Sequence, residues 1–321
     1  MKALITGGAG FIGSHLADFL VAQRDDVIIL DNMSTGSWTN IAHLEKGIEL
    51  HEGDIRDKAL VEQLVEKSDV VFHMAAALGV KNIMEHTLES IDRNFNGSEI
   101  VLHASTKHDK RIIIASTSEI YGKNPNQPLS EESDRVVGAP QKIRWTYSDS
   151  KALEEAVAHT LHKTRGLRVT TARFFNTVGP RQTGQYGMVV PRFVESALKN
   201  EAITIYDTGL QSRVFCHVED AVKAVIALSD TASTIGNYFN VGGFEETTIK
   251  ELATKIIEQT KSTSTINFIP YSDVYPAGFE DMQRRVPDIS KIKNAIDWEP
   301  RHSLSSIIDS VISNLRGDDQ I

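Results

Sequence analysis

The chain has 321 residues, of which 40% are hydrophobic and 24% are charged. Its 34 basic and 43 acidic residues give a net charge of −9, which argues against nucleic-acid binding through clustered Lys and Arg. No stretch approaches the roughly 18 apolar residues of a membrane span, and the N-terminus does not resemble a signal peptide. The single cysteine, Cys216, excludes an internal disulfide, and the 11 histidines lack metal-site spacing. We therefore expect a cytoplasmic globular protein without a bound metal.

The first thirty residues predict a strand, a turn, a helix and a second strand. Lys2–Thr6 has the pattern of a short buried strand. Residues 11–23 carry apolar side chains at helical spacing, and residues 27–30 form another apolar run. Such a βαβ unit implies a parallel sheet with a right-handed crossover.

The same alternation continues to about residue 175. Strands are expected at 48–51, 70–74, 111–116 and 168–174, and helices at 58–66, 88–107 and 146–163. This order predicts an α/β protein with a doubly wound parallel Rossmann sheet formed by residues 1–175.

The pattern is looser beyond residue 175. A loop is expected at 179–188, helices at 190–199, 218–227 and 249–260, and a strand at 202–206, whereas 268–287 has no clear period. We expect residues 176–321 to form mainly a smaller mixed α/β substrate-binding cap, with segments at about 210–240 returning to the Rossmann domain.

A glycine-rich turn follows the first strand. Gly7, Gly10 and Gly13 are spaced three residues apart, and a helix is expected to begin near Phe11. Glycines let the backbone approach a pyrophosphate closely, and a helix N-terminus supplies unpaired N–H groups with a partial positive charge. In this strand–turn–helix setting the glycines predict a dinucleotide site.

Two acids follow the next two strands. Asp31 ends the second strand, 18 residues beyond Gly13, where a carboxylate accepts hydrogen bonds from the adenosine ribose and repels a 2′-phosphate. This position predicts NAD rather than NADP. Asp54 follows the third strand, where an acid could meet the adenine amino group.

Tyr147 and Lys151 stand four residues apart on a predicted helix and therefore share one face. Ser116 and Thr117 end a strand that should finish at the same crevice, because ligands of open α/β sheets bind at the carboxyl ends of the strands. A nearby ammonium stabilises a phenolate, so the pair predicts a tyrosine acting as a general base.

These motifs resemble the extended short-chain dehydrogenase/reductase family that modifies nucleotide-diphosphate sugars. The resemblance covers essentially the whole chain. It rests on residues 6–13, Asp31, residues 73–76, residues 116–122, Tyr147 with Lys151, residues 173–176, residues 179–181 and Arg213. It implies a homodimeric enzyme that holds NAD, oxidises C4 of the sugar and acts on the keto intermediate.

The resemblance also implies roles for particular residues. Tyr147 would take the C4 hydroxyl proton, Lys151 would hold the nicotinamide ribose, and Thr117 would bond the sugar hydroxyl. Asn176 and Arg213 would hold the diphosphate, with Arg192 also at the substrate. The remaining cofactor-binding residues would be Phe11, Ile12, Asn32, Ile55, Ala75, Ala76 and Ser116.

Glu119 bears on which reaction follows the oxidation. Sugar 4-epimerases usually carry a small or apolar residue there, whereas Thr-x-Glu resembles 4,6-dehydratases and UDP-glucuronate decarboxylases. Residues 143–151 and 278–288 resemble a decarboxylase domain in which an arginine at the place of Arg285 lies beside the sugar carboxylate. Two residues depart from that pattern, because Phe279 replaces a tyrosine and Thr204 replaces a basic residue.

The first expectation is a UDP-glucuronate decarboxylase. A UDP-sugar 4-epimerase and an NDP-sugar 4,6-dehydratase remain as alternatives within the family. A dinucleotide sensor without activity is the alternative of a different class, although such proteins commonly lose the Tyr–Lys pair that this chain retains.

Overall fold

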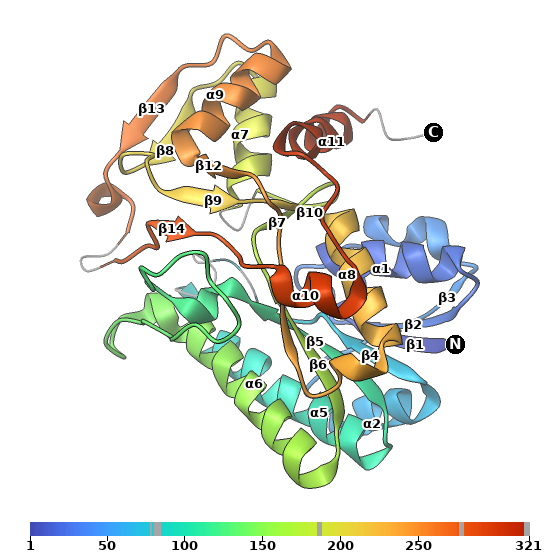
Figure 1. Ribbon diagram of the computed structural model, residues 1–321. Helices are drawn as coiled ribbons and strands as arrows, with labels where there is room; N and C mark the ends of the chain where they lie inside the picture. Colours follow the sequence, from blue (N-terminus) through green and yellow to red (C-terminus); the bar gives the residue numbers. More distant parts are fainter. Residues whose placement is uncertain (78, 80–84, 185–187, 276–278, 318–321) are drawn as a thin grey trace.

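A seven-stranded parallel sheet forms the larger part of the molecule in the computed structural model (Figure 1). The structure describes residues 1–317 except 78, 80–84, 185–187 and 276–278. The strand order is β11-β6-β5-β4-β1-β2-β3. The strands are β1 (Lys2–Thr6), β2 (Asp26–Asp31), β3 (Ile48–Glu52), β4 (Val70–His73), β5 (Arg111–Thr117), β6 (Arg168–Phe174) and β11 (Tyr238–Val241). This arrangement confirms the predicted doubly wound sheet.

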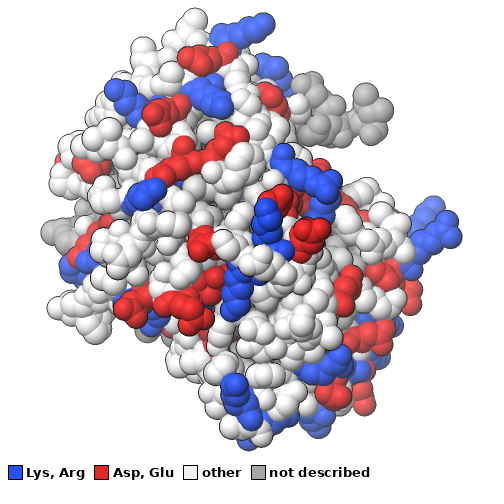
Figure 2. All heavy atoms as spheres, in the orientation of Figure 1, with Lys and Arg blue, Asp and Glu red and all other residues white. Residues whose placement is uncertain are grey.

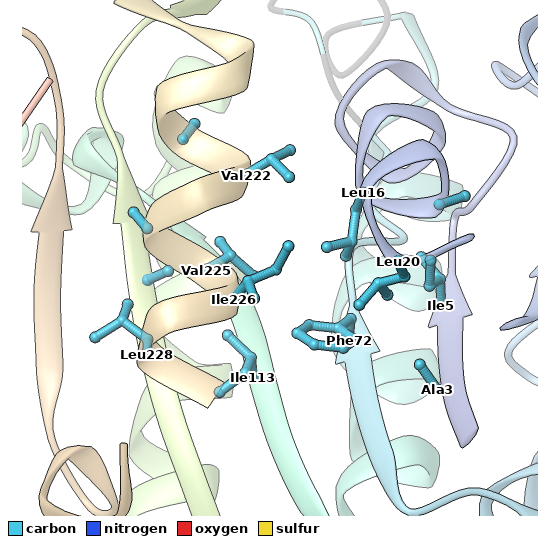
Figure 3. Close-up of a cluster of buried hydrophobic side chains, with 14 of the residues drawn as sticks. Ala3, Ile5, Leu16, Leu20, Phe72, Ile113, Val222, Val225, Ile226 and Leu228 are labelled. Carbon is cyan, nitrogen blue, oxygen red and sulfur yellow. The ribbon is translucent and has the colours of Figure 1, made fainter. Parts of the chain in front are cut away.

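Helices cover both faces of this sheet. The helices around it are α1 (Phe11–Ala22), α2 (Lys58–Lys67), α4 (Thr87–Ile91), α5 (Ser98–Lys107), α6 (Thr146–Arg165), α8 (Val218–Asp230) and α10 (Ser290–Ile296). Side chains of a strand alternate between faces. Ala3 and Ile5 therefore pack toward α1 and α8, in the core shown in Figure 3, while Leu4 packs toward α2, α5 and α6. Two buried apolar layers thus hold the sheet rigid beneath the site.

The order of the strands places a crevice beside β1. The chain runs outward from β1 through β2 to β3, and then returns to the other side of β1 as β4. The connections at the carboxyl ends of β1 and β4 therefore diverge, which leaves room for a ligand between them. The turn after β1 carries Gly7, and the segment after β4 carries Ala75 and Ala76.

A smaller unit lies beyond the carboxyl ends of the strands (Figure 1). Its core is formed by α7 (Val189–Leu198), α9 (Ile249–Thr260), α11 (Leu304–Arg316) and the parallel pair β8 (Ile203–Tyr206) and β13 (Ile266–Ile269). A second small sheet has the order β12-β9-β14, and a third pairs β10 with β7. The bounds of these strands are β7 (Thr177–Val178), β9 (Ser212–Val214), β10 (Cys216–His217), β12 (Glu246–Thr248) and β14 (Arg284–Arg285).

After residue 176 the chain passes from the smaller unit back to the main sheet, so elements that are consecutive in sequence do not all lie in the same unit. Strand β11 pairs with β6 in the main sheet, and α8 packs against that sheet, although both follow the first elements of the smaller unit. The sequence did not reveal β7, β9 through β14, α10 or α11. The short strands β12 and β14 have too few residues for a visible period, and each depends on its pairing with β9.

The helix expected at 88–107 is interrupted rather than uniform. Residues Asp92–Gly97, between α4 and α5, form a π-helical segment. Within it the buried Asn94 accepts a hydrogen bond from the backbone N–H of Ala77 at 2.6 Å and donates one to the carbonyl of Ala77 at 3.1 Å. The interruption thus ties this helix to the segment that follows β4.

Acidic and basic side chains are interspersed on the face shown in Figure 2. They do not gather there into the basic stripe that nucleic-acid binding uses. Among the described residues, no helix combines the length and the apolar character needed to cross a bilayer.

Candidate active site

A pocket of about 490 Å³ occupies the crevice beside β1 and extends between the larger and smaller units. Its floor includes the glycine turn after β1 and the ends of β4 and β5, and its upper wall includes α7, β8 and β9. Of the residues expected at the site, those that line the pocket are Gly7, Gly10, Phe11, Ile12, Gly13, Asp31, Asn32, Ile55, Ala75, Ala76, Ser116, Thr117, Glu119, Tyr147, Asn176, Arg192, Arg213 and Arg285. Asp54 and Lys151 do not line it.

The glycine turn leaves no space for larger residues. Gly7 has a φ of +72°, and a Cβ on Gly13 would lie 2.2 Å from the carbonyl oxygen of Gly7. Gly10 precedes α1 without a side-chain cap, so the first N–H groups of this helix remain available. This cradle fits the pyrophosphate of a dinucleotide, because backbone donors and the positive helix end face a site that no described side chain fills.

Asp31 lies at the end of β2 in the pocket wall. Its carboxylate oxygens accept hydrogen bonds from the N–H of Ala9 at 2.9 Å and of Met33 at 2.8 Å. Burial raises the pKa of Asp31, and these hydrogen bonds oppose that shift. Each carboxylate oxygen retains a second lone pair, so the group can also accept from a ribose diol.

Replacing Asp31 with Ala is expected to weaken NAD binding about 10- to 100-fold, because roughly one to two charge-assisted hydrogen bonds to the ribose are lost. NADP binding should weaken much less, because the charge that repels a 2′-phosphate disappears at the same time. Titration calorimetry with both dinucleotides measures the two dissociation constants. An unchanged preference for NAD would contradict this role of Asp31.

Asp54 does not line the pocket, but it contacts Asn32 and Arg56 behind the pocket wall. It accepts a hydrogen bond from Asn32 Nδ2 at 3.0 Å and pairs with Arg56 at 2.8 Å. The hydrogen bonds from Arg56 are the main reason that the pKa of Asp54 is lowered. Asp54 thus orients Asn32, which does line the pocket, and its direct contact with adenine stays a prediction.

Tyr147 projects from the first turn of α6 into the pocket. Its phenol is a hydrogen-bond partner of Thr117, at the end of β5. Burial raises the pKa of Tyr147, and the negative charges of Glu119 and Glu154 raise it further. Lys151, one turn along the helix, is 1% exposed and donates its hydrogen bond to Glu154.

Glu119 is held between two arginines beside Tyr147. Arg144 Nη1 donates to Glu119 Oε2 at 2.6 Å, and Arg285 Nη1 donates to Glu119 Oε1. Although burial by itself would raise it, the two guanidinium groups lower the pKa of Glu119 to about 2. Glu119 is therefore a carboxylate at neutral pH, and it acts as an acceptor rather than a proton donor in this arrangement.

The same arginines connect to the substrate residues expected from the sequence. Arg285 Nη2 donates to Asn176 Oδ1, and Asn176 Nδ2 donates to the carbonyl of Val214 at 2.8 Å. Arg213 pairs with Asp281 at 3.2 Å, and Asp281 also accepts a hydrogen bond from the hydroxyl of Tyr271 at 2.9 Å. The structure thus joins residues from the turn after β5, from β9 and from β14 into one polar network.

The described pocket lining carries six arginines against three carboxylates. The arginines are Arg93, Arg144, Arg181, Arg192, Arg213 and Arg285, and the acids are Asp31, Glu119 and Asp281. A chain with a net charge of −9 therefore lines its pocket with excess positive charge. Such a pocket attracts a ligand with several negative charges.

Sequence reasoning missed several pocket residues. Arg144 lies in the stretch 143–151 that resembles a decarboxylase domain, but it was not expected at the site, although its place three residues before Tyr147 was an available signal. Asp281, Tyr271 and Tyr275 lie in the aperiodic 268–287 stretch, which gave no signal. Phe279 stacks on Tyr275 with ring centroids 3.9 Å apart, while Thr204 is not among the lining residues. Gly278 lies outside the described residues.

In the described part of the chain, one group of possible metal ligands lies outside the pocket. His217, Glu219 and His302 have ligand atoms within 4.8 Å of one another. The two imidazoles are stacked at 4.1 Å with an interplanar angle of 24°, so the lone pairs of their nitrogens lie in two nearly parallel planes about one ring spacing apart. Lone pairs in this orientation do not converge on one ion, and the group gives no support for a metal site.

Comparisons with known proteins agree with this geometry. The sequence model of the family described as GDP-mannose 4,6 dehydratase matches residues 4–311. A UDP-N-acetyl-alpha-D-glucosaminuronate decarboxylase from Bacillus cytotoxicus is 44% identical over 303 residues, which is 94% of each chain. UDP-glucuronic acid decarboxylase 1 from Danio rerio is 36% identical over 93% of this chain and 69% of its own length. The chain belongs to the GDP-mannose 4,6 dehydratase family, within the extended short-chain dehydrogenases/reductases.

A solved structure supports the cofactor as well. UDP-glucuronic acid 4-epimerase from Bacillus cereus, in complex with UDP-glucuronic acid and NAD, superposes with a TM-score of 0.88 at 26% identity, covering 99% of both chains. The protein is accordingly an NAD-dependent enzyme that modifies a nucleotide-diphosphate sugar, and the expectations of NAD and of enzymatic activity are confirmed.

Proposed function

We propose that this enzyme decarboxylates a UDP-linked hexuronate after oxidising its C4. The observation that carries the proposal is the pair of arginines, Arg144 and Arg285, gathered around Glu119 beside Tyr147. If Tyr147 acts on the C4 hydroxyl, the substituent on the adjacent C5 lies within reach of these guanidinium groups. A carboxylate at C5 is the substituent that such groups bind best.

The roles of the residues follow from their positions. Tyr147 takes the proton of the C4 hydroxyl, while Thr117 orients that hydroxyl. The glycine turn and Asp31 hold NAD, and Lys151 bonds its ribose. NAD supplies the acceptor for the hydride that leaves C4.

Oxidation at C4 makes the hexuronate a β-keto acid. Carbon dioxide is then lost readily, because the electrons of the breaking bond move into the ketone. The site needs to hold the carboxylate and to stabilise the oxyanion that forms at C4. The positive charge of Arg285 and the hydrogen-bonding groups of Tyr147 and Thr117 can do both. No protonated acid is required for this step, in agreement with the ionised Glu119.

The smaller unit would bind the nucleotide end of the substrate. Arg213 is 8% exposed and lines the pocket from β9, and Asn176 lies beside it at the junction of the two units. Both are placed to hold the diphosphate. Arg192 of α7 packs over Tyr206 at 4.9 Å and extends the positive wall. We therefore assign most substrate contacts to residues 176–321 and most cofactor contacts to residues 1–175.

The test is to incubate the enzyme and NAD with UDP-glucuronate or UDP-N-acetylglucosaminuronate and to follow the product by mass spectrometry. Loss of CO₂ from either is the expected result. An unchanged mass with an inverted C4 would instead identify a 4-epimerase, the reaction named for the solved neighbour. Loss of water from a neutral NDP-hexose, with both uronates inert, would identify a dehydratase. Either result would overturn the proposal.

We further propose a cytoplasmic homodimer formed through α4 and α6. Leu88 of α4 is 84% exposed, and Ile91 of α4 and Leu153 of α6 are also exposed. A second copy would cover these apolar side chains, since helices bury such stripes against one another. Sedimentation equilibrium should give twice the mass of the chain, and Leu88→Glu should give the monomer. A monomeric wild-type protein would contradict the proposal.

A further inference from the structure

A buried ion pair lies one helical turn beyond Tyr147. Lys151 donates a hydrogen bond to Oε2 of Glu154, and both side chains are 1% exposed. A buried ion pair costs several kcal/mol of desolvation per ion, so it is weak evidence for stability and invites a functional explanation. Lys151 is directed to a protein carboxylate, whereas its neighbour Tyr147 reaches the pocket.

Lys151 is the one cationic partner of Glu154 among the described residues. His73 of β4 bonds Thr6 at 2.7 Å and Ser98 at 2.8 Å, and Ser98 lies beside Glu154. Burial, followed by the charge of Lys151, lowers the pKa of His73 to about 3, so this histidine is neutral at physiological pH. The adjacent Glu155 does not compete for Lys151, because it pairs with Arg173 at 2.7 Å.

We propose that Glu154 is a positioning residue that competes with the cofactor ribose for the Lys151 ammonium and opposes the effect of Lys151 on the Tyr147 phenol. The inference rests on the roles of Tyr147 and Lys151 in the proposed function. Glu154 thereby makes it harder for Tyr147 to lose its proton and act as a general base. This effect is relieved when Lys151 turns from Glu154 to the ribose hydroxyls.

Electrostatics at Tyr147 support this role. Of the described charged groups, Glu119, Glu154 and Arg285 act most strongly on its phenol, and Thr117 is its hydrogen-bond partner. After burial, the two glutamates raise the pKa of Tyr147, while Thr117 and Arg285 lower it. Burial raises the pKa of Glu154 and the charge of Lys151 lowers it, so the ion pair keeps a negative charge near the phenol that a neutral residue at position 154 removes. The phenolate then forms more easily, so the pKa falls.

Glu154→Gln keeps the shape of the side chain and removes its charge, and two measurements need no sugar substrate. The first is the NAD dissociation constant, which should fall about three- to tenfold because a larger fraction of molecules presents Lys151 to the ribose. The second is the ultraviolet titration of the Tyr147 phenol, taken as the difference from Tyr147→Phe. Its midpoint should move to lower pH.

Two further variants separate this role from a purely structural one. Glu155→Gln also removes a buried carboxylate from α6, and it should lower the melting temperature without moving the phenol titration, because Glu155 bonds Ser116 and Arg173 instead. In a Lys151→Met background, Glu154→Gln should no longer tighten NAD binding. This double-mutant cycle isolates the part of the effect that passes through Lys151.

The proposal fails if Glu154→Gln leaves the phenol titration and NAD affinity unchanged, or if it weakens NAD binding. Should the variant not fold, a crystal structure of the wild-type enzyme with NAD decides the question. Lys151 Nζ should then bond the ribose and lie beyond hydrogen-bond distance of Glu154, whereas a retained Lys151–Glu154 bond would overturn the proposal. The NAD dissociation constant and the phenol titration still test the proposal if the enzyme is not a decarboxylase, because neither measurement uses a sugar substrate.

Discussion

Replacing Tyr147 with Phe is expected to lower kcat by about 10³-fold, the loss of a positioned general base. The phenol lines the pocket and is hydrogen-bonded to Thr117, so Tyr147→Phe removes one oxygen without disturbing the ring. NAD should still bind, because the glycine turn and Asp31 are untouched. Steady-state turnover of the uronate, together with NAD quantified in the purified protein, measures both effects.

A matched control is Tyr238→Phe. Tyr238 is also partly buried, but it lies on β11, where its ring packs against His159 and away from the pocket lining. This control should retain wild-type turnover. Turnover of Tyr147→Phe within threefold of the wild-type value would remove Tyr147 from the chemistry.

The pH dependence of the wild-type enzyme follows from the same group. Burial and the neighbouring carboxylates raise the pKa of Tyr147, so the phenol is protonated at neutral pH in this arrangement. The phenolate is the active form, and turnover should therefore rise with pH and fall as the pH drops below the phenol pKa of the substrate complex.

Replacing Arg285 with Ala is expected to lower kcat/KM for the uronate by at least about 100-fold, or ~3 kcal/mol, because a buried charge contact with the substrate carboxylate is lost. Arg285 is largely buried and donates to Glu119 and Asn176. Binding of a neutral UDP-hexose, measured by calorimetry, should change much less. The difference between the two ligands reports the carboxylate contact.

The adjacent Arg284 provides the control. It is substantially exposed and pairs with Glu246 at 2.7 Å outside the pocket lining. Arg284→Ala should leave kcat/KM near the wild-type value, since exposed ion pairs contribute little. Equal losses for the uronate and the neutral sugar in Arg285→Ala would show that the arginine supports the fold of the site rather than binding a carboxylate.

The sequence predicted the larger unit well because its signals are local. The expected strand Lys2–Thr6 is observed without change as β1, and the helix at 249–260 is α9. A strand buried on both faces reads as an apolar run, and a glycine turn followed by a helix reads as a phosphate site. None of these signals needs a contact distant in the sequence.

The polar network around Glu119 could not be predicted in the same way. Its members come from the turn after β5, the turn before α6, β9 and β14. They meet only because β14 pairs with β9 above the ends of the main strands. The two-residue β14 has no periodicity of its own. Arg285 was expected only through its resemblance to a decarboxylase, and Arg144 and Asp281 were not expected at all.

The amino-acid sequence by itself determined the Rossmann sheet, the dinucleotide turn and the adjacent tyrosine and lysine, because each depends on residues within one or two neighbouring elements. Only the tertiary structure decided which charges surround the Tyr147 phenol and where Lys151 directs its ammonium. Ion pairs such as Arg285–Glu119 join residues more than 160 positions apart. Lys151 pairs with Glu154 because both side chains are buried together. Spacing along the chain carries no information about either choice.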